Sequence, residues 1–326
     1  MKKSSWLFSA ILIISTMITI SSNNWISMWI GLELNMMSFI PLMLYNINKS
    51  TSEGAMIYFL TQSMSSMLLM MMILLYMYKY LIPINLINTI AEISILIKLG
   101  AAPFHTWMPK IMASISWMKC CILMTWQKLA PLFMISNLNS TVTINLSIIM
   151  SVMIGSLGGI NQTSLRKIMA YSSINHIGWM LAISKSMNLW LLYLMIYSLL
   201  MFFMCFMLNN YKMNFINQMS MLNINNTEKI NLFIMMMSLG GLPPFIGFMP
   251  KWITIQSMIN ENSYIMINVM IMFSLITLMF YLRIMTNMFL SFSSSIKWIN
   301  INQNKSITYS IITMNMSLPL IMIMDM

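Results

Sequence analysis

The sequence predicts an all-α polytopic membrane protein with about eleven transmembrane helices, built as inverted repeats with two discontinuous helices. Three features indicate this class: the composition, a series of apolar segments, and a motif that interrupts two of them. Hydrophobic residues make up 59% of the 326 residues, charged residues make up 7%, and mean hydropathy is +0.79. Soluble domains carry about 25% charged residues, so the composition excludes that class.

Apolar stretches long enough to cross a bilayer, about 20 residues each, predict the individual helices. In chain order they cover 5–20, 25–45, 54–78, 86–111, 114–136, 142–160, 165–184, 188–209, 229–259, 263–289 and 306–324. The longest polar stretches between them are about 210–228 and 291–305. We therefore expect a single transmembrane bundle over residues 1–326, without a soluble domain.

Glycine and proline residues interrupt the fourth and ninth segments, 86–111 and 229–259. The interrupting runs are LGAAPFHTWMPK at 99–110 and GGLPPFIGFMPK at 240–251, and six of their twelve positions are identical. A broken helix is tolerated in a membrane only where the freed backbone lines a polar cavity or is buried in protein. The two segments are five crossings apart, an odd number, so they run in opposite directions. Paired broken helices in inverted repeats indicate an ion pathway between the repeats.

The basic residues indicate membrane orientation rather than nucleic-acid binding. The formal net charge is +11. With eleven crossings, eleven basic residues fall on the side of the N-terminus, and Lys79 and Lys185 fall on the other. By the positive-inside rule, the N-terminus faces the cytoplasm or matrix.

Signatures of bound cofactors are missing from the sequence. Three cysteines, Cys120, Cys121 and Cys205, are too few for a four-cysteine iron–sulfur site. The chain has no glycine-rich phosphate loop or dinucleotide fingerprint. Its two histidines lack the partners of a metal site. We therefore expect no cofactor and no metal in this chain.

Four charged residues lie inside predicted membrane segments. Each costs roughly 2.5–3.5 kcal/mol at the centre of a helix, so we expect them to face the bundle interior. They are Glu33, Lys98, Lys128 and Lys251. Lys98 lies about 18 Å into its segment at 1.5 Å per residue, too deep to reach water. Because a buried lysine can exchange a proton near neutrality, a row of them at mid-depth indicates a proton relay.

Structural roles remain open for some of these residues. Asn35 and Ser38 are candidates to satisfy the Glu33 carboxylate, and Glu92 is a second candidate partner for Lys98. His176 lies mid-helix with Ser172 and Ser173 on the same face, which fits a hydrogen-bonded core histidine as well as a relay.

The runs around these residues resemble those of the antiporter-like membrane-arm subunits of respiratory complex I, mitochondrial NADH–ubiquinone oxidoreductase. They are WIGLE at 29–33, KLGAAPFH at 98–105, WQKLAP at 126–131, RKIMAYSSI at 166–174 and the run 240–252. The 46 methionines indicate an A+T-rich genome with an additional methionine codon, as in animal mitochondria.

The resemblance implies a fold of two inverted five-helix repeats, shortened by three N-terminal helices in animal members. It implies that Glu33 and Lys98 are paired charges of the first half-channel. Lys128 is then the central relay lysine, Lys251 the lysine of the second broken helix, and His176 a residue on the hydrated axis between them. Partner subunits hold NADH, FMN, iron–sulfur clusters and ubiquinone. The implied location is the mitochondrial inner membrane, with the N-terminus in the matrix, among other complex I subunits and membrane lipids and without nucleic acid.

Two other functions remain open. A free-standing cation/proton antiporter uses the same broken helices, although sodium needs oxygen ligands and lysines dominate here. A purely structural spacer in the membrane arm leaves the cost of four buried charges unexplained.

Overall fold

The computed structural model of the chain describes residues 2–45, 48–77, 83–138, 142–221, 226–290 and 305–317. Almost all of this part is helical, which confirms the predicted all-α fold. In chain order the helices are α1 (Lys2–Ser21), α2 (Trp25–Met43), α3 (Lys49–Met77), α4 (Ile84–Leu99), α5 (Trp107–Ser114), α6 (Trp117–Met124), α7 (Trp126–Ser136), α8 (Val142–Ile160), α9 (Leu165–Ala182), α10 (Met187–Asn210), α11 (Ile216–Met221), α12 (Asn226–Gly240), α13 (Phe248–Asn260), α14 (Tyr264–Leu290) and α15 (Lys305–Asn315).

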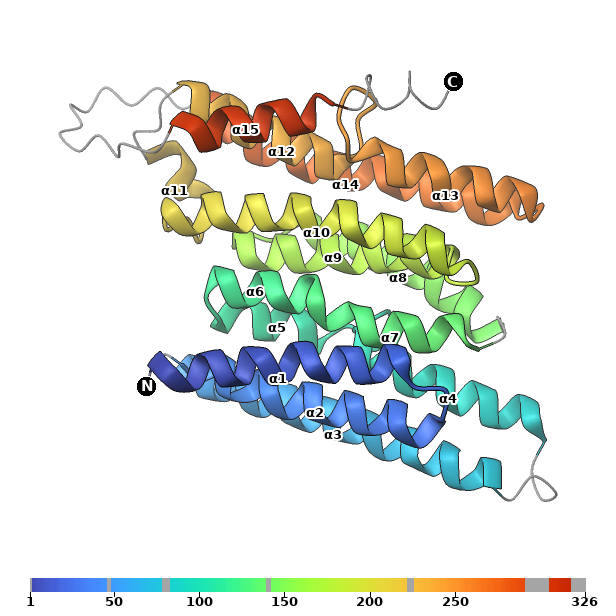
Figure 1. Cartoon of the computed structure of the whole chain (residues 1–326). Helices are drawn as coiled ribbons and strands as arrows, with labels where there is room; N and C mark the ends of the chain where they lie inside the picture. The colour runs from blue at the N-terminus through green and yellow to red at the C-terminus, as the bar shows by residue number, and fades with distance from the viewer. Residues whose placement is uncertain are drawn as a thin grey trace.

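The helices lie side by side with roughly parallel axes, as Figure 1 shows. Helices that follow one another in sequence pack together, as in α1 with α2, α3 with α4, and α8 with α9. Contacts of α7 with α4 and α10, and of α13 with α9 and α10, connect the early and late helices. The lysine-bearing helices α4, α7 and α13 are therefore linked through α9 and α10.

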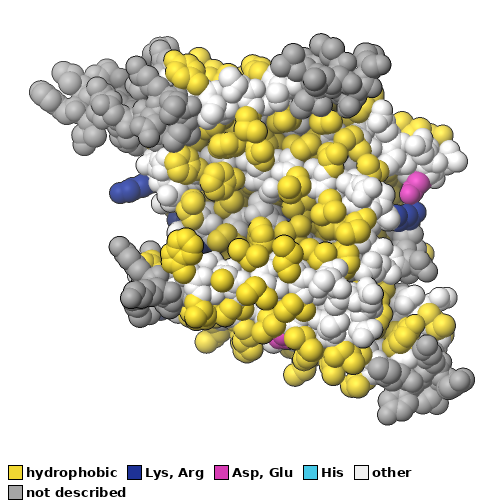
Figure 2. Space-filling view, in the orientation of Figure 1, with side chains coloured by type: hydrophobic (Ala, Val, Ile, Leu, Met, Phe, Trp, Pro, Cys, Tyr) yellow, Lys and Arg dark blue, Asp and Glu magenta, His cyan; other side chains and the backbone are white. Residues whose placement is uncertain are grey.

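The outer surface is as apolar as the interior. Met64 and Met67 on α3 expose 70% and 74% of their area, and Ile265 on α14 exposes 82%. Figure 2 shows hydrophobic side chains across the visible face and charged ones mostly at its two ends. Five helices, α2, α3, α8, α10 and α14, are long and apolar enough to cross a membrane. The chain is a multi-pass membrane protein, and the number of eleven crossings stays a prediction.

Both broken helices stop in the same way. The first half-helix ends at a glycine in the left-handed region, Gly100 with φ 71° and Gly241 with φ 78°. Each glycine N–H bonds to the carbonyl three residues back, and the next N–H to the carbonyl five residues back. This is the Schellman motif, which favours glycine because φ is positive there. The helices resume as α5 at Trp107 and as α13 at Phe248.

The two broken helices run in opposite directions. The pair α4–α5 runs toward the end of the bundle where the N-terminus lies, and α12–α13 runs away from it (Figure 1). This is the relation that the inverted-repeat prediction requires.

The fifth predicted segment, 114–136, differs from a continuous helix. It is divided into α6 and α7 at Thr125, whose backbone has φ −116° and ψ −70°. Pro131 lies inside α7 and offers no N–H to the carbonyl of Gln127. The sequence thus carries a third interruption, which places Lys128 just after a helix start.

Some predictions fall on residues outside the described ranges. They concern Lys79, most of the polar stretch 291–305, and residues 318–324 of the last predicted helix.

Candidate functional site

Lys98 lies in the last turn of α4, just before the first break. Its residue is buried, with 7% exposure. Glu33, on a partly buried position of α2, is the acidic group whose charge acts on the Lys98 ammonium. Cations are also attracted to the C-terminal end of a helix. Glu33 and the end of α4 therefore both attract the Lys98 ammonium, as the sequence pairing predicts.

Glu92, the second candidate partner, faces another helix. It is fully buried on α4 and accepts a hydrogen bond from the Thr143 hydroxyl on α8. His105 lies in the break itself, with Nδ1 3.2 Å from the Pro103 carbonyl oxygen.

A polar cavity separates Lys98 from the next lysine. It has a volume of about 20 Å³, and α2, α3, α4 and α7 contribute its walls. The Gln127 amide donates to Asn35 Oδ1 at 2.9 Å, and the Tyr58 hydroxyl donates to Gln127 Oε1 at 3.4 Å. Gln62 donates to the Lys98 carbonyl oxygen at 3.4 Å. A polar space of this size holds about one water molecule, so the cavity joins Lys98 to the residue beside Lys128.

Lys128 has neutral partners. Its residue is 2% exposed, and Nζ donates to the Ser173 carbonyl oxygen of α9 at 3.2 Å. The same atom lies 4.8 Å from the ring centroid of Tyr197 on α10, a cation–π contact. Both partners attract the ammonium without a formal negative charge.

His176 lies on α9 between the second and third lysines. Its Nδ1 is 2.8 Å from the Tyr193 hydroxyl, and its ring centroid is 4.7 Å from that of Tyr197. The charges of Lys128 and Lys251 both act on the imidazole. His176 is therefore electrostatically coupled to both lysines while its tautomer depends on one tyrosine hydroxyl.

Several buried polar atoms near His176 have no protein partner. They are Asn175 Oδ1, Trp179 Nε1 and the hydroxyl of Tyr197. Buried polar groups in proteins are satisfied by protein atoms or by ordered water. Their clustering around the histidine is typical of a hydrated region.

Lys251 reaches back across the second break. It lies in the first turn of α13, and its Nζ donates to the Gly240 carbonyl oxygen at 2.8 Å. The ring centroid of Trp179 is 5.7 Å from Nζ. A Cβ at Gly241 would lie 2.7 Å from Lys251 Cδ, so the side chain occupies the space that this glycine leaves.

Lys98 and Lys251 do not align in the two motifs, since Lys110 is the residue that aligns with Lys251. Lys98 precedes its break and Lys251 follows its own. Both nevertheless belong to the C-terminal end of a first half-helix: Lys98 by position on α4, and Lys251 through its bond to the last residue of α12. The negative end of a helix dipole thus faces a lysine at both breaks.

The structure brings four predicted residues into one series across the bundle, which we call the buried row. It comprises Lys98, Lys128, His176 and Lys251. Glu33 adjoins it at Lys98. The sequence analysis missed the neutral polar groups that join these residues, namely Tyr58, Gln62, Gln127, Tyr193 and Tyr197. A signal existed for the two glutamines, which interrupt apolar runs; tyrosines are ordinary in such helices.

A family model described as NADH:quinone oxidoreductase/Mrp antiporter, TM, matches residues 22–277. The chain belongs to this family. The matched span contains Glu33 and the whole buried row. Membership confirms the resemblance inferred from the sequence motifs.

Curated proteins of the NADH:quinone oxidoreductase/Mrp antiporter family include close relatives named NADH-ubiquinone oxidoreductase chain 2. The protein of Anopheles gambiae is 47% identical over 300 residues, which cover 89% of this chain and 87% of the relative. That of Aedes aegypti is 44% identical over 326 residues, covering 97% and 95%. That of Oryctolagus cuniculus is 41% identical over 285 residues, covering 84% and 82%.

Solved structures similar to this member of the family include a chain of respiratory complex I from Thermus thermophilus. It has a TM-score of 0.83 at 18% identity and covers 95% of this chain and 75% of that one. A chain of the Mrp complex from Dietzia sp. has a TM-score of 0.73 at 16% identity, covering 86% and 60%. These matches confirm the antiporter-like fold.

Proposed function

We propose that the chain is a proton-translocating subunit of the membrane arm of respiratory complex I, where NADH:ubiquinone electron transfer drives proton pumping. One observation carries the proposal: the buried row crosses the interior between two broken helices, and neutral polar groups join its members. Each charge held there costs several kcal/mol in a membrane. A row of such groups without fixed counter-charges is suited to moving protons.

The geometry gives each residue a task. Glu33 and the end of α4 hold a proton on Lys98, and the cavity beside Gln62 and Gln127 leads toward Lys128. The Ser173 carbonyl and the Tyr197 ring hold the Lys128 ammonium. His176 then lies within electrostatic reach of both later lysines. Because like charges repel, a proton gained at one lysine favours its release from the next.

We assign the redox chemistry to partner subunits. NADH, FMN, iron–sulfur clusters and ubiquinone are bound there, and this chain takes part through its contacts with neighbouring membrane-arm chains and lipids. We place the protein in the mitochondrial inner membrane with the N-terminus in the matrix and the C-terminus on the intermembrane-space side. The name shared by the relatives and the excess of basic residues on the N-terminal side support this placement.

Assembly distinguishes this function from that of a free-standing antiporter. The test is a native gel of gently solubilised membranes stained for NADH dehydrogenase activity, with the chain located by mass spectrometry. We expect the chain only in a very large NADH-active band. Migration alone, without NADH activity, contradicts the proposal and favours cation/proton exchange.

Pumping tests the buried row directly. Lys98→Met keeps the apolar stem and removes the ammonium, so we expect normal assembly and proton pumping per NADH lowered by about tenfold or more, the usual effect of losing a proton-transfer group. Lys110→Met, at an exposed position on α5, is the matched control and should leave pumping unchanged. Unchanged pumping by Lys98→Met contradicts a relay through this residue.

A further inference from the structure

A basic pocket opens at the end of the bundle where α3, α6 and α9 begin, away from the buried row. It has a volume of about 720 Å³. Its walls come from the first turns of these three helices and from the ends of α5 and α10. The polar side chains that matter here are Thr51, Ser116, Lys119, Arg166, Lys212 and Asn214. We call this the basic pocket.

The positive charges of the basic pocket have only neutral partners. Arg166 donates to the carbonyl oxygens of Ala113 and Ile115 at 3.0 and 2.7 Å, and to Asn214 Oδ1 at 2.9 Å. Lys119 Nζ donates to the Met43 carbonyl oxygen at 2.9 Å. Among the described residues that line the pocket, none is Asp or Glu. These bonds fix the cations in place without neutralising them.

The helix ends add to this positive field. Thr51 lies in the first turn of α3, Ser116 precedes α6, and Arg166 is the second residue of α9. Helix N-termini carry partial positive charge and exposed N–H groups that suit anions. With three basic side chains and three such ends at one cavity, the pocket is built for an anion.

Apolar surface adjoins the basic pocket. Met118, beside Lys119, exposes 43% of its area, and Phe215, beside Asn214, exposes 51%. Tyr45 exposes 44%, and its ring centroid lies 5.7 Å from Lys119 Nζ. A free anion gains nothing from these groups, whereas a lipid places its chains against them.

We propose that the basic pocket binds the phosphate group of an anionic phospholipid, whose acyl chains lie against the neighbouring apolar surface. Lys119, Arg166 and Lys212 supply the charge, and Ser116 and Asn214 supply neutral hydrogen bonds. Zwitterionic lipids present a cation beside the phosphate and bind this pocket less well. Basic pockets between helices at this level of a membrane protein suit such headgroups.

The test uses the full-length chain in uncharged detergent with short-chain phosphatidylglycerol as the probe. Binding is measured by native mass spectrometry and by titration at two salt concentrations. Phosphatidylcholine of the same chain length and inorganic phosphate are the comparison ligands. We expect phosphatidylglycerol to bind at least about tenfold more tightly than either, and less tightly at high salt.

Variants locate the site. Lys119→Gln with Lys212→Gln should weaken phosphatidylglycerol binding by about tenfold or more, since each lysine contributes about 1 kcal/mol near an anionic lipid. Lys110→Gln with Lys185→Gln removes the same charge elsewhere and should leave binding unchanged. The pair Lys119→Arg and Lys212→Arg keeps the charge and should retain binding.

Three results overturn the proposal. Phosphatidylcholine may not match phosphatidylglycerol in affinity, so equal binding of the two removes the anionic preference. Inorganic phosphate that binds as tightly as the lipid identifies a free-anion site instead. Equal loss of binding in the glutamine and arginine pairs shows that charge at these positions is not what holds the lipid.

Discussion

Lys128 is buried without a carboxylate beside it. A carbonyl oxygen and an aromatic ring hold its ammonium, and the residue is 2% exposed. A carboxylate at this point would fix the positive charge permanently. Neutral partners leave the charge sensitive to the neighbouring titratable groups, of which His176 is the nearest along α9. This sensitivity is what a relay requires.

Tyr193 sets the orientation of His176 through the 2.8 Å contact between its hydroxyl and Nδ1. Tyr193→Phe keeps the ring and leaves a buried imidazole nitrogen without its partner, at a cost of about 1–3 kcal/mol. We expect proton pumping per NADH to fall several-fold while the complex still assembles.

The control for this variant is Tyr264→Phe, at an exposed tyrosine whose hydroxyl contacts Asn262 at 3.1 Å. Pumping quench in vesicles and a native gel measure the two effects. Equal pumping by Tyr193→Phe and the control would show that the hydroxyl has no part in the relay.

Charge and polarity decide which site residues the sequence can predict. Glu33 and the three lysines stand out because a charged residue inside an apolar window has a high cost. Tyr193 and Tyr197 give no such signal, since aromatic residues are common in membrane helices. Their contact with His176 depends on how α9 and α10 pack, which a single sequence does not encode in any local pattern.

Gly241 joins the second break to the lysine that serves it. Its φ of 78° favours glycine, and Lys251 fills the space where a side chain would be. Gly240, one residue earlier, is helical and its carbonyl accepts the Lys251 bond. Adjacent glycines thus have different physical roles.

Gly241→Ala should therefore damage the site. The left-handed conformation costs an alanine about 1–2 kcal/mol, and the new Cβ would displace Lys251. Gly240→Ala is the matched control, because its Cβ meets nothing closer than 3.7 Å. We expect pumping to fall strongly in the first variant and to stay normal in the second; equal activity of the two contradicts a tight fit between Gly241 and Lys251.

The α8–α9 pair is packed through small residues. A Cβ at Gly155 would lie 2.6 Å from the backbone nitrogen of Asn175, and one at Gly178 would lie 2.5 Å from Ser151 Oγ. Small residues let membrane helices approach closely, and here they hold α9, which carries His176, against α8.

Gly155→Val should separate these helices, since the obstructing atom belongs to the backbone and cannot rotate away. We expect less assembled complex on a native gel and a lower unfolding temperature. Leu157→Val, at a position 50% exposed on the same helix, is the control. Normal assembly of Gly155→Val would contradict the close approach.

The interruptions differ in how visible they are in the sequence. Repeated Gly and Pro residues mark the breaks in 86–111 and 229–259. The division at Thr125 has no glycine, and Pro131 comes a turn and a half later, so periodicity favours one helix over 114–136. Local geometry at Thr125, where both its N–H and its hydroxyl bond to the Cys121 carbonyl oxygen, decides the outcome.

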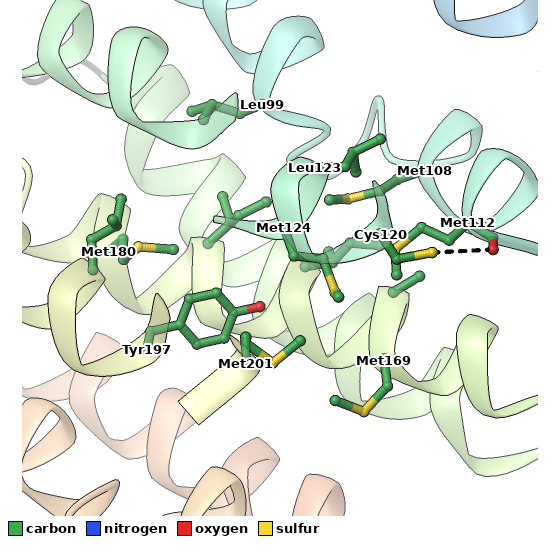
Figure 3. Packing of buried hydrophobic residues seen from close by; sticks show 14 of the residues in the cluster. Leu99, Met108, Met112, Cys120, Leu123, Met124, Met169, Met180, Tyr197 and Met201 are labelled. Atoms are coloured by element: carbon green, nitrogen blue, oxygen red, sulfur yellow. Dashed lines mark hydrogen bonds between the residues drawn. The ribbon is translucent and has the colours of Figure 1, made fainter. Parts of the chain in front are cut away.

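Methionine-rich packing surrounds the polar path through the bundle. Figure 3 shows Met112, Met124, Met169 and Met201 in the packing near Tyr197. Such apolar surroundings leave water few places to enter, so protons are confined to the polar groups. The composition predicts this apolar interior, but not which helices enclose it.

The orientation of the bundle is open to a labelling experiment. Lys185 and Lys212 are both exposed, at opposite ends of α10. We expect Lys185→Cys to react with a membrane-impermeant maleimide added from the intermembrane space, and Lys212→Cys to react only after the inner membrane is opened.

Wild-type chain is the background control, since Cys120, Cys121 and Cys205 are buried. The reverse labelling pattern would place the N-terminus in the intermembrane space and contradict the charge-based orientation.

The short half-helices also govern how the protein is made. The 13 residues of α13 span about 20 Å, less than the roughly 30 Å of a hydrocarbon core, and the eight residues of α5 span less still. Neither is a stable insertion unit alone. Helix α5 packs against α9, which leaves the ribosome much later. Translation that stalls before α9 therefore leaves the first broken helix uncovered in the bilayer, as a substrate for quality-control proteases rather than as a partly working pump.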